Sequence, residues 1–447
     1  MFSQEIHQKI YFWALAYLCF SIPFMSKWIP FTIGVIILAL NFLTEKKLFS
    51  RLKKAVRNTW VLLFVLFYML HLISVAYSTN MYEANRDLFL KLPLLIIPVV
   101  LSSITLMESQ KKKLYSIWIL ATVMAACLLI GHAYINYTDT GYTRFLLYSG
   151  LAGGKHPAYF SIYCITAITL LFQYKFKKWK ALPLIFLLLM VFLLSSRMQI
   201  LVLLAIAFAK VCQEFTQSKK TRPIVIIAFV AIMSLFLSEN VRSKIRLNTA
   251  HKEIAQLFSQ DFKSSIRGSI WSFGLQTIQG SPLIGYGNGD EFEVLNQAIQ
   301  SKVNLKESDV IALANQTIQD TSIMKSLYAT AEIRGWDKSD LHLRYAKWKL
   351  IKDSNNPYNK FYKHYYNYHN QFLQSWATAG ILCLFVLLGI FLISVKIAIQ
   401  DKDFALLAIV FLITMSFMSE SILERQYGVI YFALILPIMM LENHKSV

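Results

Sequence analysis

Charged residues are scarce in this chain, acidic ones especially. Only 16% of the 447 residues are Asp, Glu, Lys or Arg, whereas 56% are hydrophobic, and long apolar runs recur along nearly the whole length. The excess of 45 basic over 25 acidic residues gives a formal charge of +20, but no basic cluster suggests DNA binding. We therefore interpret the chain as an all-α, polytopic membrane protein whose cations report its orientation and attract anionic lipid.

Cysteine is also rare, and no carboxylate pair has the spacing of outward-facing metal ligands. All five cysteines lie in apolar segments, so we expect free thiols and neither disulfides nor a metal site or cofactor. Asp290, Glu291 and Glu293 come nearest to a carboxylate group, and we interpret them as a solvated turn. The glycines at alternate positions in Gly285–Gly289 predict a structural turn, because no Lys-Ser/Thr pair follows as in a nucleotide phosphate loop.

The sequence shows no small-residue cleavage pattern after its first apolar run and no internal repeat, so we expect an uncleaved first helix. Runs of sufficient length predict about twelve transmembrane helices. They begin near Tyr11, Trp28, Trp60, Leu88, Leu114, Pro157, Ala181, Gln199, Pro223, Phe372, Phe404 and Val429. This divides the chain into about nine helices in residues 1–237, a large loop in residues 238–368, and about three helices in residues 369–447.

Cations gather in alternate loops, which predicts the orientation of the chain in its membrane. The clusters are Lys46–Arg57, Lys111–Lys113, Lys175–Lys180 and Lys219–Arg222. By the positive-inside rule these loops and both termini are cytoplasmic, and the large loop lies outside the cytoplasm. Its centre, Glu291–Lys352, has the pattern of amphipathic helices. These form either a packed helical cap or a lid over a substrate cavity, and the sequence leaves the role of residues 291–365 open.

His369 lies where a polar stretch enters a long apolar helix. Asn370 is placed to cap that helix, whose positive N-terminal end favours an anion nearby. An interfacial histidine in a tyrosine-rich belt is the alternative, and His364 fits that description equally well. Among the charged residues near apolar sequence, Arg197 either snorkels to the surface or binds an anion. Glu420 and Glu424, four apart on one expected helical face and followed by Arg425, favour structural pairing with an arginine over catalysis.

Four stretches together resemble the O-antigen ligase and polymerase superfamily, membrane enzymes that move glycans off a polyprenyl diphosphate. His369-Asn370, with Leu373 and Gly380 behind it, resembles the superfamily's signature, and Ser195-Ser196-Arg197 resembles its embedded arginine motif. The other two stretches are Arg267 with Trp271 followed by residues 281–287, and residues 420–426 with Gly428.

The resemblance implies an enzyme that transfers a glycan from undecaprenyl diphosphate to a lipid A-core sugar hydroxyl on the periplasmic side. Arg197 and Arg267 would bind the diphosphate and His369 would be the base, so the reaction inverts the anomeric centre without a metal. Asn370, Glu420, Glu424 and Arg425 would support this site. The partners are then the lipid-linked glycan donor, a glycan acceptor and membrane lipid.

Three alternatives stay open from sequence alone. A polymerase would transfer the glycan to another lipid-linked glycan, and a protein O-oligosaccharyltransferase would transfer it to protein hydroxyls. A transporter or flippase would also have about twelve helices, but the sequence lacks two similar halves.

Overall fold

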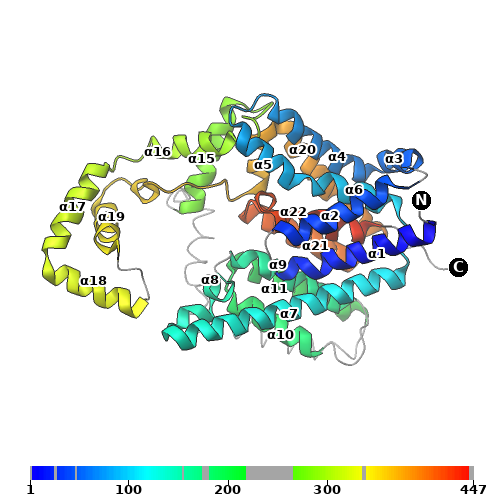
Figure 1. Ribbon diagram of the computed structural model, residues 1–447, viewed down its shortest axis with the longest axis horizontal. Coiled ribbons are helices and arrows are strands. Elements are labelled where there is room, and N and C mark those ends of the chain that lie inside the picture. The colour runs from blue at the N-terminus through cyan, green and yellow to red at the C-terminus, as the bar shows by residue number, and fades with distance from the viewer. Residues whose placement is uncertain are drawn as a thin grey trace.

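The computed structural model describes residues 3–24, 28–45, 48–153, 156–173, 181–217, 265–334 and 339–441, and these form helices with no strand among them (Figure 1). The predicted all-α class is therefore confirmed. The cations at residues 175–180 and 219–222, the helix expected after Pro223 and the boundary at 237/238 lie outside the described residues.

The N-terminal part of the chain contributes most of the helical bundle. Its helices are α1 (Gln4–Ser21), α2 (Trp28–Leu43), α3 (Leu48–Arg57), α4 (Thr59–Val75), α5 (Met81–Lys91), α6 (Pro93–Ser103), α7 (Glu108–Thr140), α8 (Tyr148–Leu151), α9 (Pro157–Gln173), α10 (Ala181–Leu193) and α11 (Arg197–Gln217). Three helices complete it, α20 (Gln371–Gln400), α21 (Phe404–Ser419) and α22 (Gln426–Met440). A 3-10 turn, η6 (Ile422–Glu424), joins the last two.

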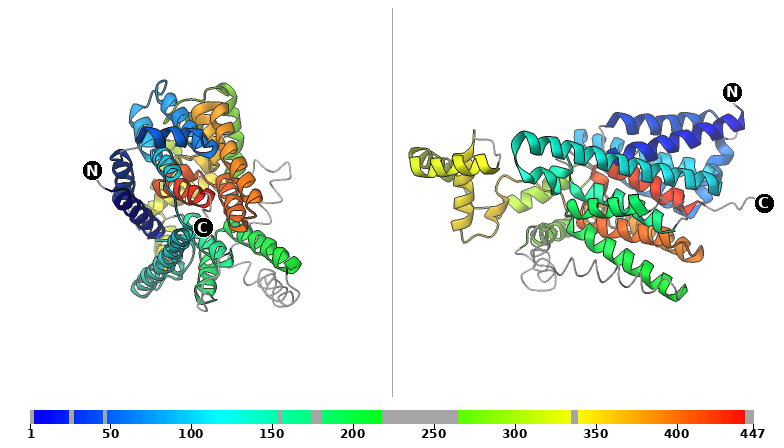
Figure 2. Two further views of the ribbon diagram at one scale, coloured as in Figure 1. Left: turned by 90° about the vertical axis from the view of Figure 1, so that its right-hand side faces the viewer. Right: turned by 90° about the horizontal axis from the view of Figure 1, so that it is seen from below.

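Two helices form the centre of the bundle. From Gly428 to Met440 every residue of α22 is buried, and so is α9 from Pro157 to Leu171. A helix that is apolar on all sides is stable only when other helices surround it. α22 packs against α6 and α21, and α9 packs against α10 and α21, so segments distant in sequence enclose the centre (Figure 2).

The outside of the bundle is apolar in a way that suits lipid. Ile33, Ile36 and Leu40 on α2 and Phe385 and Leu392 on α20 are all exposed. Exposed apolar surface of this extent marks a membrane-facing surface. The chain is thus a membrane protein.

The expected count of about twelve transmembrane helices is not confirmed. In the described part, α7 and α20 are long and apolar enough to cross a membrane, and α3 with α4 makes a third span if this pair, bent by 94°, counts as one. Shorter apolar helices cover Pro30–Leu43, Pro157–Gln173, Ala181–Leu193, Phe404–Ser419 and Gln426–Met440.

A second group of helices extends away from the bundle, as Figure 1 shows at the left. It comprises α15 (Ile266–Gly280), α16 (Glu291–Gln300), α17 (Glu307–Gln319), α18 (Thr321–Arg334) and α19 (Leu341–Asp353). Helices are therefore present after Glu291, as predicted. α15 ends just before Ser281-Pro282, as expected from the sequence.

The glycine-rich turn joins this group to the bundle by backbone contacts. α20 is broken at Ala379 and Gly380, where φ is −130° and 79°. Tyr286 N and Gly287 N donate to the carbonyls of Ala377 and Thr378 at 2.8 and 3.0 Å, and so satisfy groups that the break releases. The turn is structural, as predicted.

Asp290 and Glu291 are not the solvated residues that the sequence suggested. Asp290 accepts hydrogen bonds from Thr79 N at 2.6 Å and Asn80 N at 2.8 Å, and so holds the turn before α5. Glu291 is only 5% exposed. Both carboxyl groups instead join α16 to the bundle.

Candidate active site

His369 is held at the start of α20 by local interactions. The Asn370 side chain accepts from Phe372 N at 3.0 Å and Leu373 N at 3.1 Å, which confirms the predicted helix cap. His369 itself has φ of 45°, an uncommon conformation for a residue with a side chain and one that occurs often at functional sites. His364, the alternative, lies instead against Lys347, 3.2 Å from its Nζ.

The Glu420 side chain contacts three other ionisable side chains. Glu420 follows the end of α21 in an extended conformation, and its carboxylate is 7% exposed. Its Oε2 lies 3.1 Å from His369 Nδ1, and its Oε1 lies 2.5 Å from Arg267 Nη2 and 3.4 Å from His156 Nε2. One carboxylate therefore bridges three groups that the chain separates widely.

Electrostatics keep this carboxylate ionised. Burial alone would raise the pKa of Glu420, but the hydrogen bond with His369 and the charges of Arg267 and His156 outweigh burial and lower that pKa. Burial also lowers the pKa of His156, against the attraction of Glu420. An anion therefore stands beside the positive end of α20.

Arg267 reaches Glu420 from α15. This helix packs on α20 where Gly274 meets Tyr368, and a Cβ on Gly274 would collide with that ring. The Arg267 side chain remains 45% exposed, so its guanidinium has donors available beyond the bond to Glu420. The predicted pairing of Glu420 with an arginine is confirmed.

Arg197 lies outside the contacts of this cluster. It begins α11, after a turn in which Ser195 has φ of 49°. Two residues later, the buried Gln199 donates to Ser416 Oγ at 3.0 Å, and Ser416 is one turn before Glu420. The start of α11 thus lies against the end of α21, but no described contact joins Arg197 to Arg267 or His369.

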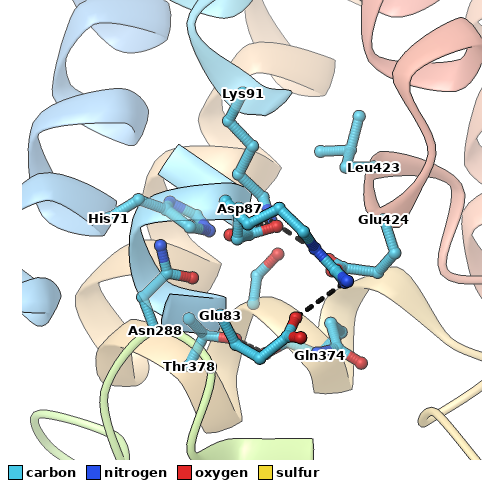
Figure 3. Close-up of polar contacts among 12 residues, drawn as sticks. His71, Glu83, Asp87, Lys91, Asn288, Gln374, Thr378, Leu423 and Glu424 are labelled. Atoms are coloured by element: carbon cyan, nitrogen blue, oxygen red, sulfur yellow. Dashed lines mark hydrogen bonds and ion pairs between the residues drawn. The ribbon is translucent and has the colours of Figure 1, made fainter. Parts of the chain in front are cut away.

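Glu424 belongs to a second cluster. Because α21 ends at Ser419, Glu420 and Glu424 do not share a helical face, and that expectation is wrong. Glu424 lies 3.2 Å from Lys91 Nζ, and Lys91 also contacts Asp87 at 2.5 Å (Figure 3). Arg425, the last of the predicted supporting residues, is exposed and stands at the N-cap position of α22.

Sequence reasoning missed His156, Asp87 and Lys91. His156 precedes Pro157 at the start of a buried apolar helix, just as His369 precedes α20, and this parallel was the available signal. Asp87 and Lys91 lie four residues apart where a membrane span was expected to begin, and charges there need a partner. In the described residues, no group of three His, Cys, Asp or Glu side chains has an arrangement suited to a metal ion.

Comparison with protein families agrees with the resemblance in the sequence. Residues 182–320 match the family model described as O-antigen ligase. The matched stretch is less than a third of the chain, and it supports the resemblance to the O-antigen ligase and polymerase superfamily. This match includes Arg197 and Arg267, whereas His369 and Glu420 lie beyond it, and no curated protein matches the chain. Members of this family are glycosyltransferase-like enzymes that use lipid-linked glycans and glycan acceptors.

Proposed function

We propose that the chain is an O-antigen-ligase-type glycosyltransferase of the bacterial inner membrane. It transfers a glycan from undecaprenyl diphosphate to a lipid A-core sugar hydroxyl on the periplasmic side. The observation that carries the proposal is the Glu420 carboxylate, which holds the imidazole of His369 and the guanidinium of Arg267 in one place. A base and an anion-binding group are the two elements that this reaction needs, since the diphosphate is already a good leaving group.

His369 acts as the base. With Nδ1–H donated to Glu420, Nε2 carries the lone pair and faces away from the carboxylate. Nε2 takes the proton of the acceptor hydroxyl while the acceptor oxygen bonds to the anomeric carbon. The bond from that carbon to the diphosphate oxygen breaks, and its electron pair leaves with the diphosphate. Direct displacement of this kind inverts the anomeric centre.

Arg267 and Arg197 bind the diphosphate. The exposed donors of Arg267 offer a planar pair of N–H groups to a phosphate. Arg197 is placed at the start of α11, against the helix that leads to Glu420, and it completes the clamp once the donor is bound. Negative charge grows on the diphosphate as the bond breaks, so both guanidinium groups stabilise the transition state more than the ground state.

Purified protein tests this proposal directly. A defined undecaprenyl-diphosphate glycan is incubated in detergent with lipid A-core acceptor, with and without EDTA, and the glycosylated acceptor is measured. Transfer in the absence of a sealed membrane argues against a flippase, and turnover that survives EDTA agrees with the arginine clamp. The Arg197→Lys variant should lose most activity, because lysine lacks the planar, paired N–H donors of the guanidinium group. Full activity in this variant would contradict diphosphate binding by Arg197.

A polymerase of the same superfamily is distinguished by its acceptor. Cells that lack a ligase accumulate complete polymer beside unmodified lipid A-core, whereas cells that lack a polymerase make glycan of a single repeat. We expect the first phenotype.

A further inference from the structure

A cavity of about 800 Å³, lined by both polar and apolar side chains, lies near the Glu420 cluster, and none of the roles assigned above uses it. α5 and α16 form two of its walls, and the segment before α20 and the Glu424–Arg425 stretch form the others. Figure 3 shows Glu83, Asp87, Gln374 and Glu424, four of its lining residues, converging from three parts of the chain.

The lining has the chemistry of a carbohydrate site. Five carboxyl groups and several side-chain amides face the cavity, against two guanidinium groups, and Leu90 and Phe292 are the main apolar contributions. Carboxylates accept two hydrogen bonds from neighbouring hydroxyls, and amides both donate and accept, so together they match the hydroxyl pattern of a sugar. The two guanidinium groups of the lining lie among a larger number of acidic side chains, so the cavity is less suited to a diphosphate than the Arg267 side.

The floor of the cavity is held rigidly. Lys91, only 1% exposed, is 2.5 Å from Asp87 and 3.2 Å from Glu424. Gln374 Nε2 donates to Glu291 Oε1 at 2.8 Å, and Gly289 N donates to Glu291 Oε2 at the same distance. Side chains fixed in this way bind a ligand without a large ordering cost.

One residue of the cavity lining also holds the backbone of His369. Asn367 lines the cavity, and its Oδ1 accepts from the backbone N of His369 at 3.0 Å. Gln371 Oε1 accepts from Leu423 N at 2.7 Å and ties the start of α20 to the stretch between Glu420 and Glu424. The cavity is therefore joined to the His369 site through Asn367 and through the Glu424–Arg425 stretch.

We propose that this cavity binds the glycan acceptor through its sugar hydroxyls and so presents one hydroxyl to His369. The proposal rests on the proposed function, because it names the acceptor subsite of the same reaction. A sugar acceptor uses the carboxyl and amide groups of this lining, whereas a peptide acceptor would use mainly Leu90, Phe292 and Tyr365.

Kinetics with Gln297→Trp test the subsite. Gln297 is an exposed residue of α16 at the cavity, and the larger ring narrows the space for a sugar. The KM for lipid A-core acceptor should rise about tenfold, the effect of losing one or two hydrogen bonds, while the KM for the lipid-linked donor stays within twofold. Gln316→Trp, an exposed position on α17 away from the cavity, is the matched control. Equal effects on both KM values, or no effect, would overturn the proposal.

Protection of a cysteine at the same position needs no turnover. Gln297→Cys is placed in a chain whose exposed Cys127 and Cys212 are serine, and Gln316→Cys serves as its control. Lipid A-core oligosaccharide should slow maleimide labelling at position 297 at least fivefold and leave position 316 unchanged, and undecaprenyl diphosphate should slow neither. Protection by a serine-rich peptide instead, or by the donor, would refute the assignment.

The two experiments separate the proposals. Protection by the oligosaccharide in a chain that does not transfer glycan keeps the saccharide site and rejects the enzymatic function. Transfer without protection and without a change in acceptor KM keeps the function and rejects this site.

Discussion

Glu420 Oε2 lies 3.1 Å from His369 Nδ1, in a site where the same carboxylate also contacts Arg267. A carboxylate in this position fixes the tautomer of the imidazole and stabilises the imidazolium that forms when Nε2 accepts a proton. If the chain transfers glycan as proposed, the rate should therefore depend on Glu420, a residue that would not itself touch the acceptor.

Glu420→Gln tests this dependence. The amide keeps the shape of the side chain but removes the charge, so kcat should fall about 10²- to 10⁴-fold. The KM for the acceptor should change little, because Glu420 does not line the acceptor cavity. Steady-state transfer by protein that elutes normally in size exclusion provides the measurement, and a kcat near the wild-type value would show that Glu420 has only a structural role.

The two histidines at Glu420 should differ in their importance. His369→Ala removes the base and should abolish transfer while the lipid-linked donor accumulates in cells. His156 lies at 3.4 Å, its side chain is 39% exposed, and its pKa is lowered by burial, so His156→Ala should retain activity within about tenfold. Parallel assays of both variants decide the assignment, and the reverse order of activities would transfer the role of base to His156.

Glu291 predicts a pH dependence of stability. Burial, together with the charges of Glu424 and Asp87, raises its pKa from 4.5 to about 8, so the folded protein holds a proton there that the unfolded chain releases. Relative to Glu291→Gln, wild-type stability should therefore decrease as the pH rises from about 4.5 to about 8, by on the order of a few kcal/mol. The glutamine can make the same contacts if the Gln374 amide is turned over.

Thermal unfolding in detergent at pH 5 and pH 8 measures this difference. The glutamine variant should match wild type at pH 5 and exceed it at pH 8. A gap between the two proteins that does not vary with pH would mean that Glu291 is ionised throughout.

Lys91→Met should destabilise the protein strongly. It leaves Asp87 and Glu424, whose side chains are 14% and 21% exposed, without their cation, at a cost of roughly 3–5 kcal/mol. The matched control is Arg86→Met, which breaks the more exposed pair with Glu83 and should cost less than about 1 kcal/mol. Melting temperatures of the two variants provide the comparison, and similar values would contradict a buried network.

Gly380→Ala should also lower the melting temperature, through the backbone. Gly380 has φ of 79°, and a Cβ there would overlap the carbonyl oxygen of Leu283, so the alanine costs at least about 1–3 kcal/mol. Gly131→Ala in α7 has no neighbour within 4 Å and should be neutral or slightly stabilising, since alanine favours a helix. Unchanged stability in Gly380→Ala would show that the break relaxes freely.

Local features of this protein could be predicted from the sequence, and distant pairings could not. The Asn370 cap and the end of α15 before Ser281-Pro282 depend on neighbours within a few residues. The bond between Arg267 and Glu420 spans 153 positions, and no local rule specifies it. Apolar sequence surrounds Glu420 and predicts a helical face there, whereas the helix ends at Ser419.

One residue in the sequence, Gly428, indicates that the helix ends after Ser419. Gly428 lies where a Cβ would overlap the carbonyl oxygen of Ile422, so the glycine permits the chain to fold back tightly between α21 and α22. A glycine alone does not reveal which residue approaches it. The clusters at Glu420 and Lys91 therefore became visible only in three dimensions.

The interruption of α20 at Ala379 has a mechanical consequence. Its first nine residues are bonded to the 282–287 turn and packed on α15, whereas the remainder is embedded in the bundle against α4 and α21. The start of α20, which directly follows His369 and Asn370, is therefore fixed to α15 and the turn, and its position does not depend on a continuous helix through the bundle.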